Sequence, residues 1–287
     1  MERGHLSASE FRGPFDLETT VTSGQTFLWR ETEDGWYRTV DGDTIIEVTE
    51  SDGVIDWRSN ADPTEVLNRR LGLSADLPQI LEAFPSEPVV QAAKERYAGL
   101  RIVTEPVWPT LISFILSAQM RIDRIHEMVT ALRKSYGPAI EWQGRTVYGF
   151  PQPETLAAAT EAELRELGLG YRAPYVTETA ELLRDGAVDL KAVRSMEYEA
   201  AREALTEFVG VGPKVADCVL LFGMDFDEPV PLDTWIQTAI EEYFPEAAGD
   251  SYAETSRAIR DRLGPRPGYA QTYVFTHLRT GGGEQEE

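Results

Sequence analysis

Lys214 and Asp233 are the residues whose types and spacing could together carry out chemistry. Lys214 ends the sequence Gly210-Val-Gly-Pro-Lys214, and an apolar run follows it. Proline suits the first turn of a helix, so we expect Lys214 in the first turn of a helix over residues 213–223. The positive end of a helix dipole disfavours an ammonium there and makes a neutral, nucleophilic amine more accessible. The alternative is a solvated lysine at an ordinary helix start.

The two glycines before Lys214 predict a tight hairpin between two helices. Gly210 and Gly212 permit backbone conformations that are closed to other residues. Such a hairpin exposes backbone N–H groups at a helix N-terminus, which favours a bound phosphate. A phosphate carries no base sequence, so this contact would grip DNA without reading it. The alternative is an ordinary connection between two core helices.

Asp233 lies nineteen residues after Lys214, in the sequence Pro229-Val-Pro-Leu-Asp233-Thr-Trp. It is well placed to cap a helix that begins at Thr234, and capping alone is the structural interpretation. Helix N–H groups would hold such a carboxylate rigid and favour its charged form. A carboxylate of this kind can stabilise the oxocarbenium ion that develops at a sugar C1′.

Two kinds of structure are expected to position these residues. Residues 15–57 have β-rich segments separated by Gly-containing turns, which is typical of antiparallel strands. The expected strands are Phe15–Val21, Thr26–Arg30, Trp36–Val40 and Thr44–Thr49. From Pro63 the pattern is helical, and 109–135 carries two apolar stripes at helical spacing. Further helices are expected at 88–100, 153–158, 161–166, 173–185, 198–207, 213–223, 234–243, 251–262 and 268–278.

The sequence therefore predicts an α+β protein with two domains. An N-terminal antiparallel β domain with short helices is expected over residues 1–100, and an all-helical domain over 101–280. Residues 281–287, with the sequence GGGEQEE, are expected to form a disordered acidic tail.

Composition excludes several kinds of site. Cys218 is the only cysteine, so no internal disulfide and no cysteine-based iron–sulfur or zinc cluster is possible. His5, His126 and His277 stand apart in the sequence, and we expect no metal in the active site. No apolar run approaches the roughly 18 residues that span a bilayer, and the polar N-terminus lacks a signal-peptide core. A cytoplasmic protein with no membrane association is expected.

The net charge of −22 argues at first against a nucleic-acid ligand, whose phosphates attract Lys and Arg. Only four of the 27 basic residues are lysines, however, at positions 94, 134, 191 and 214. An acidic excess with so little lysine resembles proteins of organisms that keep molar salt in the cytoplasm. At about 1 M salt the Debye length is roughly 3 Å, so repulsion from DNA is largely screened. We therefore expect a halophilic archaeal origin.

Several separated motifs resemble those of one enzyme family in their order. Gly210–Lys214, the loop 223–231 and Asp233 resemble the helix-hairpin-helix, Gly/Pro-rich loop and Asp of the HhH-GPD superfamily of DNA glycosylases. The resemblance is closest to the 8-oxoguanine DNA glycosylases that are also AP lyases, and it covers nearly the whole chain. The motifs that carry it are Ser23–Arg30, Leu111–Gln119, Leu167–Ala173 and Lys214–Cys218.

The resemblance implies a fold and a reaction. The N-terminal domain would be a TBP-like antiparallel sheet, and the helical domain the HhH-GPD glycosylase domain. Lys214 would attack C1′ and form a Schiff base, and β-elimination would then nick the strand. Asp233 would be the electrostatic partner. The ligand would be duplex DNA containing 8-oxoguanine, bound by a monomer without an organic cofactor. A monovalent cation held by hairpin carbonyls is left open.

The resemblance also implies which residues bind the extruded base. Gly24 matches the residue whose backbone carbonyl accepts N7–H of the oxidised base, where guanine would present a lone pair. Gln271 and Phe275 match the residues that hydrogen-bond and stack that base. Their i, i+4 spacing also fits an ordinary core helix face. Cys218 matches the cysteine on the opposite side of the base, one turn after Lys214.

Further matches concern the DNA duplex. Tyr171 and Arg172, with Arg124, match the residues that wedge the duplex and contact the orphaned cytosine, although an arginine on a helix is usually only solvated. Two residues depart from the family pattern. Gln119 stands where the family has a wedge asparagine, which puts the preference for opposite cytosine in doubt. Trp235 stands where a histidine is common, which bears on how the damaged nucleotide's phosphate is held.

Two alternatives remain beside 8-oxoguanine excision. The first is a related glycosylase for alkylated or other oxidised purines. Lys214 counts against the alkyl-base enzymes, which lack it, and the missing four-cysteine cluster counts against the endonuclease III and adenine-glycosylase branches. The second alternative is a noncatalytic DNA-binding module that uses only the hairpin.

Overall fold

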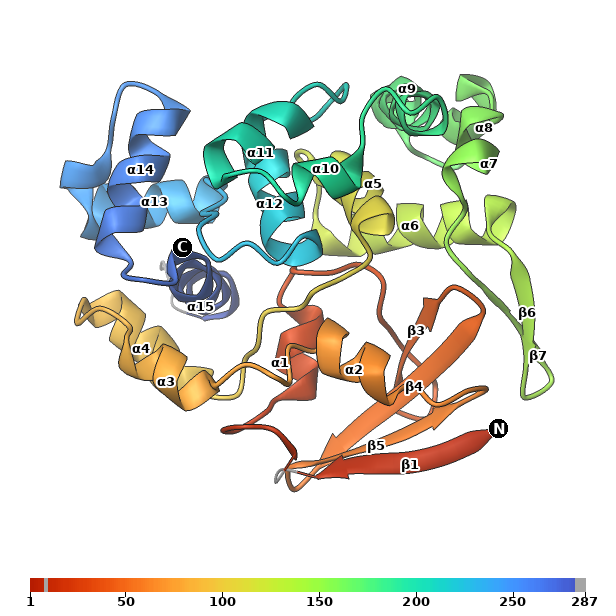
Figure 1. Cartoon of the computed structure of the whole chain (residues 1–287), viewed down its shortest axis with the longest axis horizontal. Coiled ribbons are helices and arrows are strands. Elements are labelled where there is room, and N and C mark those ends of the chain that lie inside the picture. The colour runs from red at the N-terminus through yellow and green to blue at the C-terminus, as the bar shows by residue number, and fades with distance from the viewer. Residues whose placement is uncertain (8–9, 282–287) are drawn as a thin grey trace.

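The N-terminal part of the chain forms an antiparallel five-stranded sheet, shown in Figure 1. The computed structural model describes residues 1–7 and 10–281, so the tail predicted over 281–287 lies outside them apart from Gly281. The spatial order of the strands is β1-β5-β4-β3-β2. Their bounds are β1 Glu2–Ser7, β2 Arg30–Glu31, β3 Tyr37–Asp41, β4 Thr44–Ser51 and β5 Val54–Ser59.

Two of the four predicted strands are wrong. Residues 15–21 lie mostly in helix α1 (Leu17–Thr22), not in a strand. Asp16 caps this helix, accepting hydrogen bonds from the Thr19 backbone N–H at 2.8 Å and its hydroxyl at 2.6 Å. Local capping and the burial of one helix face outweigh the β preference of the Thr-Thr-Val run. The segment predicted as a strand at 26–30 is irregular, and only Arg30 enters the sheet.

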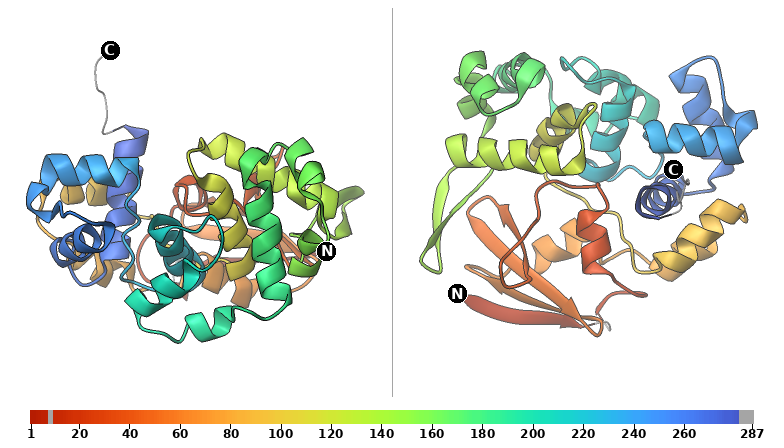
Figure 2. Two further views of the ribbon diagram at one scale, coloured as in Figure 1. Left: turned by 90° about the horizontal axis from the view of Figure 1, so that it is seen from above. Right: turned by 180° about the vertical axis from the view of Figure 1, so that it is seen from behind.

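The rest of the chain is almost entirely helical, as predicted. Figure 1 shows the sheet and α2 below, and helices α5 to α14 above them. Seen from behind in Figure 2, the same two layers remain distinct. The helices are α2 Thr64–Arg70, α3 Leu77–Glu82, α4 Pro88–Arg96, α5 Val107–Ser117, α6 Ile122–Tyr136, α7 Pro153–Ala157, α8 Glu161–Glu166, α9 Ala173–Arg184, α10 Leu190–Val193, α11 Tyr198–Leu205, α12 Pro213–Gly223, α13 Thr234–Tyr243, α14 Tyr252–Arg262 and α15 Pro267–Thr280. No helix among the described residues is long and apolar enough to cross a membrane.

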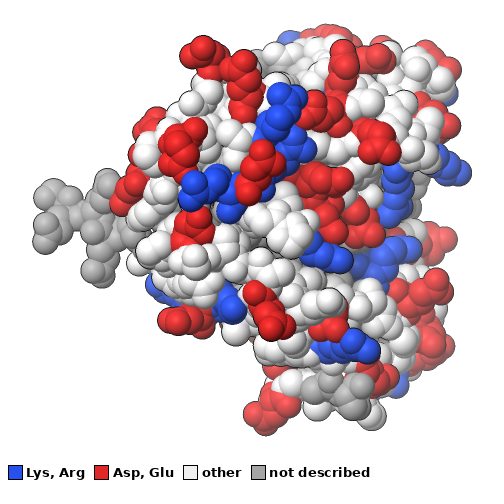
Figure 3. Space-filling model, turned by 60° about the vertical axis from the view of Figure 1, so that its left-hand side comes forward, with Lys and Arg blue, Asp and Glu red and all other residues white. Residues whose placement is uncertain are grey.

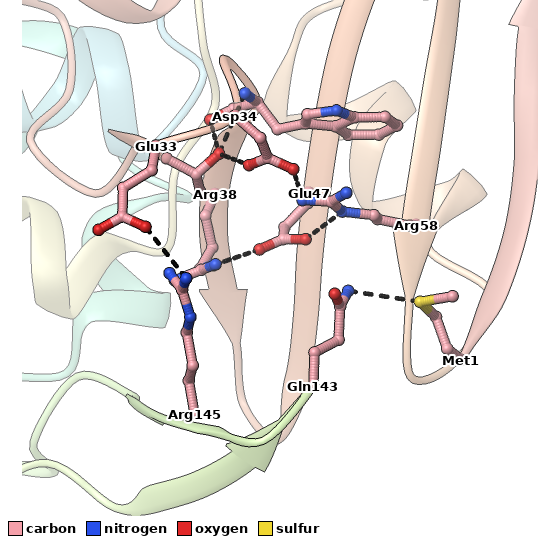
Figure 4. A network of polar contacts seen from close by, with 10 residues as sticks. Met1, Glu33, Asp34, Arg38, Glu47, Arg58, Gln143 and Arg145 are labelled. Atoms are coloured by element: carbon pink, nitrogen blue, oxygen red, sulfur yellow. Dashed lines mark hydrogen bonds and ion pairs between the residues drawn. The ribbon is translucent and has the colours of Figure 1, made fainter.

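A β-hairpin that the sequence did not indicate joins the two layers. Strands β6 (Ala139–Trp142) and β7 (Arg145–Tyr148) pack on the sheet, with Trp142 and Val147 buried against Ile45. Figure 4 shows the polar contacts at this junction, where Arg145 forms an ion pair with Glu33 at 3.0 Å. In the same view the buried carboxylate of Glu47 is held by Arg38 and Arg58.

The larger hydrophobic core lies among the helices and extends into the first hundred residues. Phe27, Leu28 and buried side chains of α3 and α4 belong to it, whereas the sheet has a separate core around Ile46 and Trp57. The boundary at residue 100 therefore stays a prediction, because α3 and α4 pack with the helical part.

A buried ion pair ties the sheet layer to the start of α5. Arg70 of α2 pairs with Glu105, and both side chains are almost completely buried. Glu105 also accepts hydrogen bonds from the Thr26 hydroxyl and the Trp29 indole, both at 2.8 Å. Its backbone N–H donates to the carbonyl of Phe222 at the end of α12. A buried charge needs such partners, and here they fix the loop that begins near residue 23 against α12.

Candidate active site

A cavity of about 760 Å³ opens between the 23–27 loop, the turn after α5, and helices α12, α13 and α15. Nine of the predicted site residues line it. They are Gly24, Gln119, Gly210, Gly212, Lys214, Cys218, Asp233, Gln271 and Phe275. Residues about 250 positions apart in the sequence, such as Gly24 and Phe275, therefore line one cavity. Its volume is in the range of small-ligand sites and suits a single nucleotide base with part of its sugar.

Lys214 lies in the first turn of α12, as predicted, with Gly212 as the N-cap residue. Its ammonium lies 5.8 Å from the centre of the Phe114 ring. An aromatic face attracts a cation without neutralising it. Within the described part of the chain, Lys214 forms no ion pair, although it interacts electrostatically with Asp233. The amine is therefore left available to a ligand in the cavity.

Asp233 is the N-cap residue of α13, as predicted. Its carboxylate accepts a hydrogen bond from the backbone N–H of Ile236 at 2.9 Å. Burial raises the pKa of Asp233, while this N–H and the charge of Lys214 act in the opposite direction. The capping N–H does favour the charged form, as expected, but the loss of solvent has the larger effect. Asp233 is thus a rigid carboxylate whose charge interacts strongly with any cation in the cavity.

Cys218 is completely buried one turn after Lys214. Burial raises the pKa of its thiol to about 12, and Lys214 opposes this shift. A thiol with so high a pKa remains protonated at neutral pH and is not a nucleophile. It presents a polarisable, weakly hydrogen-bonding surface to the cavity.

The 23–25 loop faces α15 across the cavity. Gly24 has φ 95°, a conformation that residues with a side chain rarely adopt. A Cβ atom at this position would lie 3.3 Å from Ile122 Cδ1 and 3.4 Å from Phe275 Cε1. Gln271, one helical turn before Phe275, is only 4% exposed. These three predicted base-binding residues are therefore close together on the cavity wall.

The hairpin before α12 confirms one glycine prediction and contradicts the other. Gly210 has φ 81°, and a Cβ there would lie 2.5 Å from Cδ2 of Tyr175. Gly212 has φ −86° and ψ 176°, an extended conformation that any residue adopts. No atom lies within 4 Å of where its Cβ would be. The expectation that Gly212 needs a special backbone conformation is wrong, and the space beside it lies open to a ligand.

Comparisons with known proteins agree with this geometry. Residues 112–265 match the family described as the HhH-GPD superfamily base excision DNA repair protein. Residues 7–111 match the 8-oxoguanine DNA glycosylase N-terminal domain. The chain belongs to the HhH-GPD superfamily.

Three relatives illustrate the similarity of this HhH-GPD protein. A probable N-glycosylase/DNA lyase of Methanothermobacter thermautotrophicus is 31% identical over 94% of this chain and 95% of that protein. The N-glycosylase/DNA lyase of Saccharomyces cerevisiae is 40% identical over 60% of this chain and 49% of that protein. The 8-oxoguanine glycosylase/lyase of Clostridium acetobutylicum, solved with double-stranded DNA containing cytosine opposite 8-oxoguanine, is 28% identical, with a TM-score of 0.86 over 93% of this chain and 92% of that one.

The remaining predicted residues of this HhH-GPD chain lie outside the cavity. Arg124 forms an ion pair with Glu127 at 2.6 Å. Arg172 is only 2% exposed, donates to the carbonyl of Ala118 and lies 4.3 Å from the centre of the Tyr171 ring. Tyr171 is 53% exposed. Tyr171 and Arg124 are thus exposed, whereas Arg172 is buried; Arg124 also donates to the carbonyl of Gly168 at 3.3 Å.

The turn after α5 supplies lining residues that the sequence reasoning missed. Gln119 has φ 55°, and it is followed by the exposed side chains of Met120 and Arg121, which also line the cavity. Their position directly after a recognised motif was the available signal. Trp235 is 40% exposed at the cavity mouth, beside Asp233.

Charges of both signs are mixed on the face shown in Figure 3. Acidic side chains are spread widely there, and Lys and Arg side chains lie among them.

Proposed function

We propose that this protein is a bifunctional DNA glycosylase and AP lyase that excises 8-oxoguanine from duplex DNA in base excision repair. The observation that carries the proposal is that Lys214 and the helix-capping Asp233 line the same cavity as Gly24, Gln271 and Phe275. The names of the relatives, N-glycosylase/DNA lyase and 8-oxoguanine glycosylase/lyase, support the same activity.

The first step removes the base. The Lys214 ammonium first gives up a proton to solvent; its amine then attacks C1′ of the damaged nucleotide, and the bond from C1′ to N9 of the base breaks. The electron pair of that bond leaves with the base, which takes up a proton. Asp233 stabilises the positive charge that develops on the sugar, because its carboxylate is held rigidly in a partly desolvated site.

The second step cleaves the strand. Opening of the sugar ring converts the C1′–amine adduct into a Schiff base on Lys214, with loss of the second amine proton. The Schiff base makes the C2′ proton acidic, and its removal expels the 3′ phosphate by β-elimination. Water then hydrolyses the imine and frees Lys214 for the next turnover.

Recognition of the base depends on the cavity walls. In our proposal the Gly24 carbonyl accepts N7–H of 8-oxoguanine, Phe275 stacks on the base, and Gln271 hydrogen-bonds it. Cys218 closes the opposite side with a protonated thiol. Guanine lacks the N7 proton and would place its lone pair against the carbonyl oxygen, which costs free energy.

The hairpin is proposed to hold the DNA backbone. The open space beside Gly212 and the N-terminus of the eleven-residue helix α12 together suit a phosphate. The described residues contain no group of three His, Cys, Asp or Glu side chains that could hold a metal ion. A monovalent cation would instead take backbone carbonyl oxygens of the hairpin, and it stays a proposal.

The cellular setting is also a proposal. A repair enzyme acts where the chromosome lies, which in a prokaryotic cell is the cytoplasm. The net charge of −22 with only four lysines supports a cytoplasm of high salt concentration.

Borohydride trapping on a duplex containing 8-oxoguanine tests the mechanism. Reduction of the Schiff base should give a covalent protein–DNA adduct with the wild-type protein and none with Lys214→Gln. If no adduct forms with the wild-type protein, or if Lys214→Gln still forms one, the Lys214 mechanism is contradicted. Release of an alkylated purine from a second duplex that contains one, without any adduct, would favour the alkyl-base alternative. Binding without base release would favour a noncatalytic module.

A further inference from the structure

Gln25 is a buried residue of the cavity wall for which the proposed chemistry gives no role. It follows Gly24 directly and is only 2% exposed. The side chain does not project freely into the cavity, because polar partners surround both ends of its carboxamide. A buried amide with all its hydrogen bonds made is a rigid link between the segments that it joins.

The carboxamide of Gln25 joins three segments. The two N–H groups of its nitrogen are shared among three acceptors: the carbonyl of Thr20 in α1 at 3.1 Å, the Ser23 hydroxyl at 3.0 Å and the carbonyl of Arg101 at 2.9 Å. Its oxygen accepts the backbone N–H of Val103 at 3.1 Å. The donor and acceptor ends are thus satisfied by different partners.

Arg101 and Val103 belong to the buried, extended connector between α4 and α5. The carbonyl of one residue and the N–H of the residue two positions later are the groups that a neighbouring parallel strand would bond. The Gln25 carboxamide therefore supplies the N–H and C=O that one residue of a neighbouring strand would supply. This contact holds the 23–25 loop alongside the connector.

The connector is itself fixed firmly. The guanidinium of Arg101, fully buried, donates to the carbonyls of Gly72 and Ala75, both at 3.0 Å. The backbone N–H of Thr104 donates to the carbonyl of Arg70, and that of Glu105 to the carbonyl of Phe222 on α12. The connector is therefore held to the same helix that carries Lys214.

Gly24 has no side chain with which to fix itself. Its φ of 95° is a conformation that a glycine could leave easily, and it lies between Ser23 and Gln25, which are both part of this network. The direction of its carbonyl therefore depends on its neighbours. Discrimination by one carbonyl depends on distance and angle, since the oxygen must lie close to N7 and in line with it both to accept an N7–H and to repel an N7 lone pair.

We propose that Gln25 is a positioning residue that sets specificity for the oxidised base by fixing the Gly24 carbonyl relative to Lys214. The proposal rests on the proposed function. Gln25 does not touch the reacting atoms, so it should matter for base release and not for cleavage at a site where the base is already gone.

The test compares two substrates for each variant. Gln25→Met keeps the length and volume of the side chain and removes its hydrogen bonds. Misplacement by about an ångström can cost on the order of 100-fold in rate, so we expect 8-oxoguanine release under single-turnover conditions to fall 10- to 100-fold. Incision of a preformed abasic site should stay within about twofold of the wild type.

Two further variants keep the test decisive. Ser23→Ala removes one partner of the carboxamide and should produce the same split between substrates to a smaller degree, even if Gln25→Met does not fold. Ser59→Ala is the matched control, because it removes a buried hydroxyl that accepts the backbone N–H of Ala61 at 3.3 Å at the end of β5 and does not line the cavity. It should lower the Tm without separating the two activities.

Three possible results lead to three different conclusions. A loss confined to base release in the Gln25 and Ser23 variants supports the proposal. An equal loss on both substrates that follows Tm, as in Ser59→Ala, or no loss at all, overturns it. A wild-type protein that incises abasic sites but never releases 8-oxoguanine would refute the proposed function instead.

Discussion

Cys218 lies one helical turn after Lys214 on α12, and both side chains line the same cavity. Burial raises the pKa of the Cys218 thiol to about 12, although the neighbouring Lys214 acts in the opposite direction. The proposed nucleophile therefore stands beside a thiol that stays protonated. The two groups cannot exchange roles, because a thiol reacts as a nucleophile only through its thiolate.

This relationship predicts that the folded protein resists alkylation. With a pKa of about 12, roughly one Cys218 thiol in ten thousand is ionised at pH 8. Iodoacetamide at pH 8 should leave the native protein unlabelled and active, and label it fully in guanidinium chloride, as intact mass would show. The chain has one cysteine, so any mass added by alkylation of a thiol is at Cys218. Rapid labelling of the native protein would contradict the buried, protonated thiol.

Asp233→Asn should abolish turnover and preserve the fold. Asparagine caps helices about as well as aspartate, so the hydrogen bond from Ile236 can persist and the Tm should change little. Loss of one fixed charge at a developing cation typically costs about 100- to 1000-fold in kcat. Single-turnover excision and binding to damaged duplex would be measured together, and binding should remain.

Asp189→Asn is the matched control for this variant. Asp189 caps α10 by accepting from the Lys191 backbone N–H at 2.8 Å, and it does not line the cavity. The control should be as active as the wild type. Normal excision by Asp233→Asn would reduce Asp233 to a helix cap.

Much of the site could be predicted because its residues belong to short local motifs. Lys214 and Asp233 each begin a helix, and helix starts are marked by proline, glycine and capping residues in the sequence itself. Gly212 shows the limit of this reasoning. The backbone conformation of residue 212 does not require a glycine. Only the three-dimensional structure shows that the space beside this residue is open.

Other features depended on contacts that local patterns do not encode. Asp16 turned a β-rich run into helix α1, and the hairpin at 139–148 is too short for its periodicity to stand out. The partners of Gln25 on the connector are 76 and 78 residues away in sequence. No spacing rule connects them, because the contact exists only after the sheet and the helices have packed.

The two hairpin glycines should respond differently to alanine. Gly210→Ala forces a positive φ on a residue with a side chain and places its Cβ against Tyr175, so it should destabilise the fold by about 1–2 kcal/mol or more. Gly212→Ala meets neither strain nor atoms, so its Tm should match the wild type. If a phosphate approaches there, its affinity for duplex DNA should nevertheless fall. If a folded Gly212→Ala binds duplex DNA with unchanged affinity, the hairpin does not contact the DNA backbone at this residue.

Tyr171 and Arg172 offer a second contrasting pair. Tyr171 is exposed, so Tyr171→Ala should weaken binding to damaged duplex and leave the Tm nearly unchanged. Arg172 is buried and holds the carbonyl of Ala118, so Arg172→Ala should lower the Tm first. Thermal unfolding and fluorescence anisotropy would separate the two effects. If Arg172→Ala is stable and loses only its preference for opposite cytosine, Arg172 contacts the duplex and its main role is not structural.

The charge distribution predicts a shallow dependence of DNA binding on salt. Two arginines line the cavity besides the proposed nucleophile Lys214, namely Arg121 and Arg279, in a chain of net charge −22. Each neutralised phosphate contributes a slope of about −0.9 to a plot of log affinity against log salt, so we expect a slope of about −2. Excision should then persist in molar KCl, where repulsion between the acidic surface and DNA is screened. Titrations between about 0.1 and 1 M KCl would measure the slope. A slope near −6, or binding lost above about 0.2 M, would show that phosphate ion pairs dominate and would contradict the high-salt interpretation.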